Sequence, residues 1–235
     1  MPLHTIEPAQ HTAAKAAGLL YLFTSATAIF AEFFVRGRLI VRGDAVETAK
    51  NIVASERLFR LGIASDLITE LGVVALVWAL YVVLKPIDRN LALLAAFWRL
   101  TEASVFTVSV VDALAAVLLL SGADYLQAVG TQQLQVLALF FVSLQGAGWR
   151  IGYVFLGLGS TVFSYLWLKS RYIPRALAIG GVFSSLLLAI GTLAIMVFPS
   201  LAAVVTLVYM APMAVYEVTL GFWLLVKGIR APTVA

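Results

Sequence analysis

The stretch EFFVRGRLIVRGDAVETAKNIVASERLFRLGIASDLITE, residues 32–70, decides how this chain is organised. It lies between two long apolar runs, and it carries six of the 16 basic residues together with six of the 12 acidic ones. Most of the chain that follows is hydrophobic. The stretch therefore marks the place where an otherwise apolar protein concentrates its polar side chains.

The composition indicates a membrane protein. Of the 235 residues, 62% are hydrophobic and 12% are charged, and the mean hydropathy is +1.00. Soluble domains carry about 25% charged residues, so half of that value favours lipid as the solvent. The chain has no cysteine, which excludes disulfides and thiolate chemistry. The net charge of +4 fits loop lysines and arginines at a membrane surface, and no basic tail or aromatic-basic patch points to nucleic acid.

Six segments are long enough to cross a bilayer, which takes about 20 mainly apolar residues. The apolar run Ala16–Ala31 continues into Glu32 without a small-residue cleavage site, so we expect an uncleaved first helix rather than a signal peptide. We predict an all-α, polytopic membrane helix bundle that forms a single membrane domain over residues 1–235. The expected transmembrane helices are 14–35, 58–84, 91–120, 148–168, 174–198 and 202–226.

The charges in the connections predict that both termini lie inside. The second and third outer loops then carry no Lys or Arg, in line with the positive-inside rule, whereas the first outer loop breaks that rule. Residues 133–146 are either a half-helix on the outer side or part of the fourth helix. The basic residues expected at the inner ends are Lys15, Lys85, Arg89, Lys169, Arg171, Arg175, Lys227 and Arg230.

The long first outer loop, residues 36–57, is expected to form an outer lid. Asp44 followed by Glu47 is an N-cap pattern for a helix over about Ala45–Glu56. Its residues Ala45, Thr48, Ala49, Ile52 and Val53 share one face, which predicts an amphipathic helix on the outer end of the bundle. The alternative is a solvated tether without chemistry.

Ionisable residues inside the expected helices mark a candidate site, because each costs about 2.5–3.5 kcal/mol at the bilayer centre. By helix rise, Asp66 and Glu70 of the second helix should meet Arg99 and Glu102 of the third near mid-bilayer. The charges are either paired struts that fix helix register or a site that exchanges a proton or cation, or holds a polar ligand. The candidate ligand-binding residues are Asp66, Glu70, Arg99, Glu102, Arg150, Arg60, Glu32, Arg36, Arg57 and Glu217.

Several chemistries are set aside by residue type. His4 and His11 both precede the first helix, so an intramembrane haem or histidine metal site is excluded. No glycine-rich nucleotide motif occurs. A carboxylate-only metal site at Asp66, Glu70 and Glu102 is a weak alternative, and we expect neither a metal nor a cofactor.

The fourth helix carries a small-residue face at Gly148 and Gly152, continued by Gly157 and Gly159. Such faces allow close helix packing. They indicate packing within the chain or, alternatively, a homodimer through Gly148 and Gly152. Trp149 is expected to lie in an interfacial aromatic belt.

Seven short motifs are spread along the chain. They are Ala31-Glu32-Phe33-Phe34-Val35-Arg36, Leu39-Ile40-Val41, Gly43-Asp44, Thr48-Ala49-x-Asn51-Ile52, Glu56-x-Leu58-Phe59-Arg60-x-Gly62-x-x-x-Asp66-Leu67, Trp98-Arg99-x-x-Glu102 and Tyr172-x-Pro174-Arg175. With these motifs the chain resembles a large bacterial family of integral membrane proteins that is catalogued as a domain of unknown function, number four-three-eight-six. The resemblance covers nearly the whole chain and implies a six-helix protein of the bacterial inner membrane, without an activity to carry over. Where the family usually has proline, this chain has Arg42.

Three functions are compatible with this sequence. The first is binding or moving a small or amphiphilic solute, with a small anionic ligand attracted by the arginines of the first loop. The second is a membrane-embedded enzyme on a lipid-like anionic substrate, with Glu70 or Glu102 as acid or base. The third is a structural or accessory membrane subunit. Besides its ligand, the protein is expected to contact membrane lipids.

Overall fold

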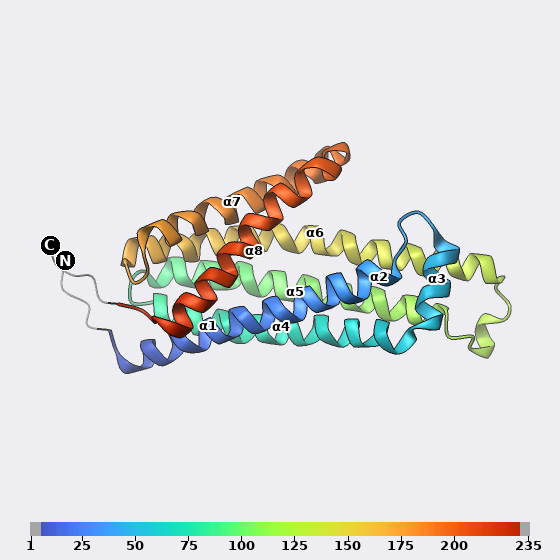
Figure 1. Cartoon of the computed structure of the whole chain (residues 1–235), viewed down its shortest axis with the longest axis horizontal. Coiled ribbons are helices and arrows are strands. Elements are labelled where there is room, and N and C mark those ends of the chain that lie inside the picture. Colours follow the sequence, from blue (N-terminus) through green and yellow to red (C-terminus); the bar gives the residue numbers. More distant parts are fainter. Residues whose placement is uncertain (1–5, 231–235) are drawn as a thin grey trace. The chain divides into compact units, whose positions relative to one another are not determined.

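A computed structural model describes residues 6–230 of the chain, except for the side chains of residues 203–207. Every long element in this range is a helix, and no strand occurs among these residues (Figure 1). The elements are α1 (Pro8–Ile29), the π-helical segment η1 (Phe30–Arg36), α2 (Gly37–Leu39), α3 (Ala45–Ala54), α4 (Glu56–Leu84), α5 (Arg89–Leu119), η2 (Asp124–Leu126), α6 (Thr131–Ser170), α7 (Arg175–Val197), η3 (Pro199–Leu201) and α8 (Ala202–Val226).

Six helices in the described part of the chain are long and apolar enough to cross a membrane. This finding confirms the all-α class and the six expected transmembrane helices. The expected bounds of the second, third, fifth and sixth helices differ from those of α4, α5, α7 and α8 by two residues or fewer at each end. Which end of each helix faces the cytoplasm, and whether the chain is a single domain, stay predictions.

Two compact units make up the chain. Unit 1 comprises Met1–Ser25, Leu71–Ala103 and Arg150–Ala235, and unit 2 comprises Ala26–Glu70 and Ser104–Trp149. The limits of the units fall inside α1, α4, α5 and α6. These four helices therefore each contribute residues to both units.

Unit 1 is held together by close helix packing. Its core includes the buried side chains of Leu80, Phe163 and Trp167. The backbones of α1 and α8 approach each other at Gly18, where an added Cβ would lie 2.6 Å from the backbone nitrogen of Leu225. Lipid tails are as apolar as leucine side chains, so the hydrophobic effect does not drive helices together in a membrane. Close contacts at small residues stabilise the helix pair instead, through van der Waals packing.

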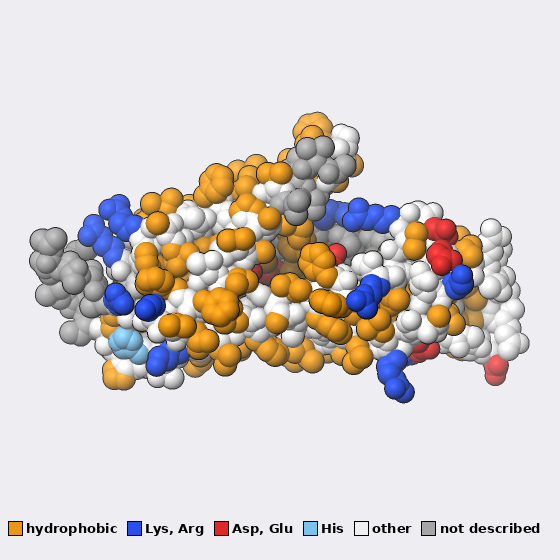
Figure 2. Space-filling model, in the orientation of Figure 1, with side chains coloured by type: hydrophobic (Ala, Val, Ile, Leu, Met, Phe, Trp, Pro, Cys, Tyr) orange, Lys and Arg blue, Asp and Glu red, His pale blue; other side chains and the backbone are white. Residues whose placement is uncertain are grey.

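Three hydrogen bonds bring several chain segments to one end of unit 1. The Gln10 side chain donates to the carbonyl of Val83 at 2.9 Å, Lys169 donates to Asp88 at 3.2 Å, and the N–H of Arg230 donates to the carbonyl of Tyr172 at 3.1 Å. Figure 2 shows Lys and Arg side chains gathered at the end of unit 1 from which α7 starts. The basic residues in the turns and helix ends concerned are Lys85, Arg89, Lys169, Arg171, Arg175, Lys227 and Arg230.

Asp88 should make the stability of the protein depend on pH. Its pKa is lowered, first by the N–H of Leu91, which it accepts at the start of α5, and then by Lys169. A lowered pKa stabilises the folded state above the unfolded-state value of about 3.9, and this contribution is lost as pH falls through the lower folded-state pKa. Asp88→Asn should therefore flatten the fall of Tm below about pH 4, measured by thermal unfolding in detergent.

A matched substitution checks that this effect is local. Asp124→Asn changes an exposed aspartate that accepts a hydrogen bond from the Gln127 side chain, so its Tm profile should follow that of the wild type. Equal acid sensitivity of Asp88→Asn and the wild type would contradict the assignment.

Unit 2 has its own hydrophobic core, which is covered at one end by α3. Figure 1 shows α3 running across the direction of the long helices of this unit. Thr48, Ala49 and Ile52 of α3 are buried, and Ile52 packs in the cluster that contains Phe59 and Val110. The predicted amphipathic helix is therefore present, although Val53 is 57% exposed and does not belong to its buried face.

The predicted N-cap of this helix is confirmed, because the Asp44 carboxylate accepts the N–H of Glu47 at 2.9 Å. Asp44→Ala should destabilise α3 by about 1 kcal/mol and raise amide exchange in α3 about fivefold, since it removes the cap. Hydrogen–deuterium exchange measures this. Glu47→Gln is the control, because it removes only an exposed ion pair with Lys50 and should change exchange little. Unchanged exchange in Asp44→Ala would mean that packing alone holds α3.

The fourth transmembrane helix is longer than expected. Residues 133–146 are not separate: they form the first part of α6, which runs from Thr131 to Ser170. A helix of 40 residues is about 60 Å long, about twice the hydrocarbon core of a bilayer. Gly146 and Gly148 both lie inside this helix despite the low helix propensity of glycine, and Gly148 packs against Ser109 of α5.

Candidate functional site

The site in unit 2 begins at the π-helical segment η1, which follows α1 directly. Here the N–H of Gly37 donates to the carbonyl of Glu32, five residues earlier, as in a π-helix. Such segments occur often at functional sites. Within η1, Nε of Arg36 donates to the Glu32 carboxylate at 2.8 Å, so one edge of the guanidinium is held by its own segment.

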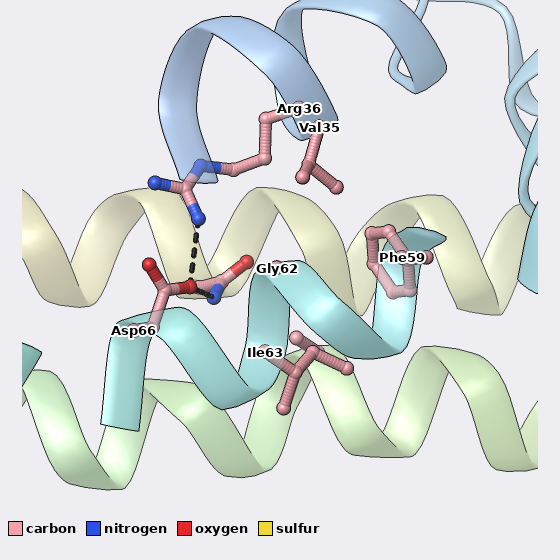
Figure 3. Close-up of a pocket in the computed structure, with 8 residues that line it drawn as sticks. Val35, Arg36, Phe59, Gly62, Ile63 and Asp66 are labelled. Atoms are coloured by element: carbon pink, nitrogen blue, oxygen red, sulfur yellow. Dashed lines mark hydrogen bonds and ion pairs between the residues drawn. The ribbon is translucent and has the colours of Figure 1, made fainter. Parts of the chain in front are cut away.

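The second partner of Arg36 is Asp66 of α4. Nη1 of Arg36 donates to the Asp66 carboxylate at 2.7 Å, and the two side chains are 13% and 10% exposed (Figure 3). Gly62, one turn earlier in α4, allows this approach, because an added Cβ would lie 2.7 Å from a methyl group of Val35. A charge-assisted bond of this length, largely removed from solvent, is among the stronger polar interactions in proteins.

Two residues of α6 complete the site, and sequence reasoning missed both. The Gln145 side chain donates to the Asp66 carboxylate at 3.5 Å, and the guanidinium carbon of Arg36 lies 3.8 Å from the centre of the Trp149 ring. Phe106 packs edge-on against this ring, with 6.4 Å between centroids. A signal was available, because Gln145 is a polar residue in an otherwise apolar stretch and lies one turn before the tryptophan. The contact of Trp149 with Arg36 was not expected, and its place in an interfacial belt stays a prediction.

The open space at this site is small. A cavity of about 10 Å³ lies beside the Arg36–Asp66 pair, lined by both residues and by Gly62, Ile63 and Gln145 (Figure 3). This volume is about that of one water probe. A larger ligand therefore has to displace a side chain, and the Arg36 side chain is the group that fills the space between the carboxylates and the ring.

Hydroxyl groups extend the polar lining along α4. Thr69 donates to the hydroxyl of Thr27 at 2.7 Å, and Ser65 donates to the carbonyl of Thr27 at 3.0 Å. Glu70 follows directly in α4 and is buried, 7% exposed. These bonds tie α1 to α4 and fix the face from which Asp66 projects.

The other candidate residues belong to unit 1 or lie at the exposed surface of unit 2. In unit 1, Nη1 of Arg99 lies 2.9 Å from the Glu102 carboxylate, and Arg99 also interacts electrostatically with Glu217. Arg60 is exposed and paired with Glu56 at 2.6 Å, while Arg57 and Arg150 are also exposed. Because Asp66 and Glu70 belong to unit 2 and Arg99 and Glu102 to unit 1, the expected meeting of these four side chains stays a prediction.

Comparison with known proteins adds one relationship. The model of a family described as Domain of unknown function (DUF4386) matches residues 16–228, nearly the whole chain. Neither a curated protein nor a solved structure matches. Together with the six apolar helices, this match describes a multi-pass integral membrane protein of uncharacterised activity.

Proposed function

We propose that this protein binds or moves a small amphiphilic solute in unit 2, and that the cationic group of the solute takes the place of the Arg36 guanidinium. The chain belongs to the family Domain of unknown function (DUF4386). The observation that carries the proposal is the surrounding of the Arg36 guanidinium. Two carboxylates at 2.8 and 2.7 Å and a tryptophan face at 3.8 Å enclose it. Carboxylates and an aromatic face are the groups that recognise organic cations.

The balance of charged residues in unit 2 favours a cationic ligand, whereas the arginines of the first loop had suggested an anionic one. Unit 2 carries eight acidic residues against six basic ones. Lys50 and Arg60 are paired with Glu47 and Glu56 at the surface, which leaves six acidic residues against four basic ones. Exchange of Arg36 for a ligand cation keeps the charge of the site constant, so the exchange avoids leaving two carboxylates without a cation.

The amphiphilic character follows from the setting. Arg36 and Asp66 lie in helices that are apolar enough to span a membrane, and the cavity beside them is lined by Val35, Phe59 and Ile63. A ligand with an apolar tail gains from burial in such surroundings. The same proposal includes the outward opening of the site, its position in a bacterial inner membrane and a homodimer through Gly148 and Gly152.

A matched pair of probes tests the proposal. Purified protein in neutral detergent is titrated with hexylguanidinium or with hexyl phosphate, and Tm is followed. Hexylguanidinium should raise Tm with concentration, whereas hexyl phosphate should not, because a ligand that binds the folded state stabilises it. Equal shifts with both probes would contradict cation recognition and favour nonspecific hydrophobic binding.

Substitutions separate a ligand site from a structural strut. Arg36→Ala removes the internal competitor, so it should bind hexylguanidinium more tightly than the wild type, a gain that a strut does not predict. Trp149→Leu keeps the ion pair and should weaken binding about fivefold by removing a cation–π contact. Glu56→Gln, on the exposed pair with Arg60, is the charge-matched control and should leave binding unchanged. If both Arg36→Ala and Trp149→Leu bound hexylguanidinium as the wild type does, the Arg36–Asp66 pair would be a structural strut and not a ligand site.

A further inference from the structure

A separate groove lies in unit 1, between α7 and α8. Its volume is about 370 Å³, and it is lined by one face of α7 from Ala176 to Ser184 and one face of α8 from Pro212 to Thr219. Both helices are apolar enough to span a membrane. The volume is within the range of about 300–1,000 Å³ found for ligand pockets, and the lining is mainly apolar.

Two neighbouring glycines show which side of α7 faces the groove. An added Cβ at Gly181 would collide with the ring of Tyr216, whereas one at Gly180 would meet no atom within 4 Å. The ring of Tyr216 is held in place by a hydrogen bond between its hydroxyl and that of Ser164 in α6, at 2.9 Å. The floor of the groove is therefore a packed aromatic ring, and Gly180 leaves open space at its rim.

Basic side chains stand at one end of this groove. Arg175 immediately precedes Ala176, the first lining residue of α7. Arg171, four residues earlier, has a φ of 55°, a left-handed conformation that side-chain-bearing residues rarely adopt. Arg230 is brought to the same turn by the hydrogen bond from its N–H to the carbonyl of Tyr172. All three are exposed, and no ion pair involves them among residues 6–230.

The length of the groove fits one leaflet of a bilayer. Ala176 and Ser184 are eight residues apart along α7, which corresponds to about 12 Å. Half of a hydrocarbon core of about 30 Å is about 15 Å. A ligand with its charge at the arginines and its tail in the groove would therefore extend through one leaflet, as a membrane lipid does.

We infer that unit 1 binds an anionic phospholipid, with one acyl chain in the α7–α8 groove and the phosphate at Arg171, Arg175 and Arg230. Charge complementarity selects an anionic head group, because unit 1 carries ten basic residues against four acidic ones. Basic residues at the ends of transmembrane helices bind such head groups. The site is distinct from the cation site of unit 2 in both its residues and its ligand.

The experiment uses the full chain in neutral detergent, with phosphatidylglycerol and phosphatidylcholine of the same acyl chains as probes. Native mass spectrometry counts the bound lipid at increasing concentration. Phosphatidylglycerol should bind the wild type more tightly than phosphatidylcholine. Arg171→Gln combined with Arg175→Gln should abolish that preference while leaving weak binding of both lipids through the tail.

Filling the groove is the second arm. Gly180→Leu places a side chain in open space, so the protein should fold, but binding of both lipids should fall about tenfold or more because tail contacts are lost. Gly146→Leu in α6 is the matched control, since an added Cβ there also meets no atom within 4 Å. Equal binding of the two lipids by the wild type, or unchanged binding in Gly180→Leu, would overturn the inference.

Discussion

Asp66→Ala should lower the free energy of unfolding by about 3–5 kcal/mol, because it leaves the Arg36 guanidinium in a largely buried place with one carboxylate fewer. Both side chains are close to nine-tenths buried, and Glu32, the remaining acidic partner, is 54% exposed. Unfolding of the purified protein by dodecyl sulfate in mixed micelles measures the loss. The effect should exceed that of any surface substitution in unit 2.

The double variant decides how much of this loss comes from the unpaired charge. Arg36→Leu with Asp66→Leu removes both partners, and replacing a buried pair by apolar residues often restores or even increases stability. It should therefore be more stable than Asp66→Ala. Arg60→Ala, which breaks the exposed pair with Glu56, should cost about 0–1 kcal/mol. If the double variant were as unstable as the single one, packing rather than pairing would explain the loss.

Gly18→Ala should destabilise unit 1 by about 2–3 kcal/mol, since one added methyl group forces two helix backbones apart. The new Cβ would lie 2.6 Å from a backbone nitrogen of α8 and 2.8 Å from the carbonyl oxygen of Gly221. Backbone atoms cannot move aside as the end of a flexible side chain can. The midpoint of unfolding in dodecyl sulfate and the fraction of monodisperse protein on size exclusion report the change.

The control for Gly18 is another helical glycine with free space around it. Gly146→Ala adds the same methyl group where no atom lies within 4 Å, and it should leave stability unchanged or slightly raised, as Ala favours helix over Gly. A similar loss in both variants would mean that glycine itself, and not the close approach of α1 to α8, is required.

Composition and periodicity were enough to predict the six spans but not all of their bounds, since the first helix begins at Pro8 and not at residue 14. Apolar runs of sufficient length identify six spans, and the Asp44–Glu47 pattern located α3 because capping is decided by neighbouring residues. The length of α6 was underestimated. The Gly146-Ala147-Gly148 sequence favours a break by local propensity, yet α6 runs through it without interruption.

The polar site was predicted only in part, because some of its contacts are local in sequence and others join distant segments. Glu32 and Arg36 are one turn apart in a helix, so their pairing follows from spacing. The approach of Asp66, Gln145 and Trp149 depends on the rotation of α4 and α6 about their axes, which hydrophobic periodicity does not determine for helices with apolar residues on every side. Tryptophan also occurs commonly at membrane interfaces, so its presence in the sequence does not by itself point to a contact with an arginine.

The π-helical segment η1 rotates the side chains that follow it about the axis of the first transmembrane helix. A wider turn holds an additional residue, and one residue corresponds to a rotation of about 100° around an α-helix. Arg36 lies at the end of this segment, so the direction in which its side chain leaves the helix depends on the extra residue. The π winding of these seven residues therefore fixes the direction in which the Arg36 side chain leaves the first transmembrane helix, and with it the contact to Asp66 of α4.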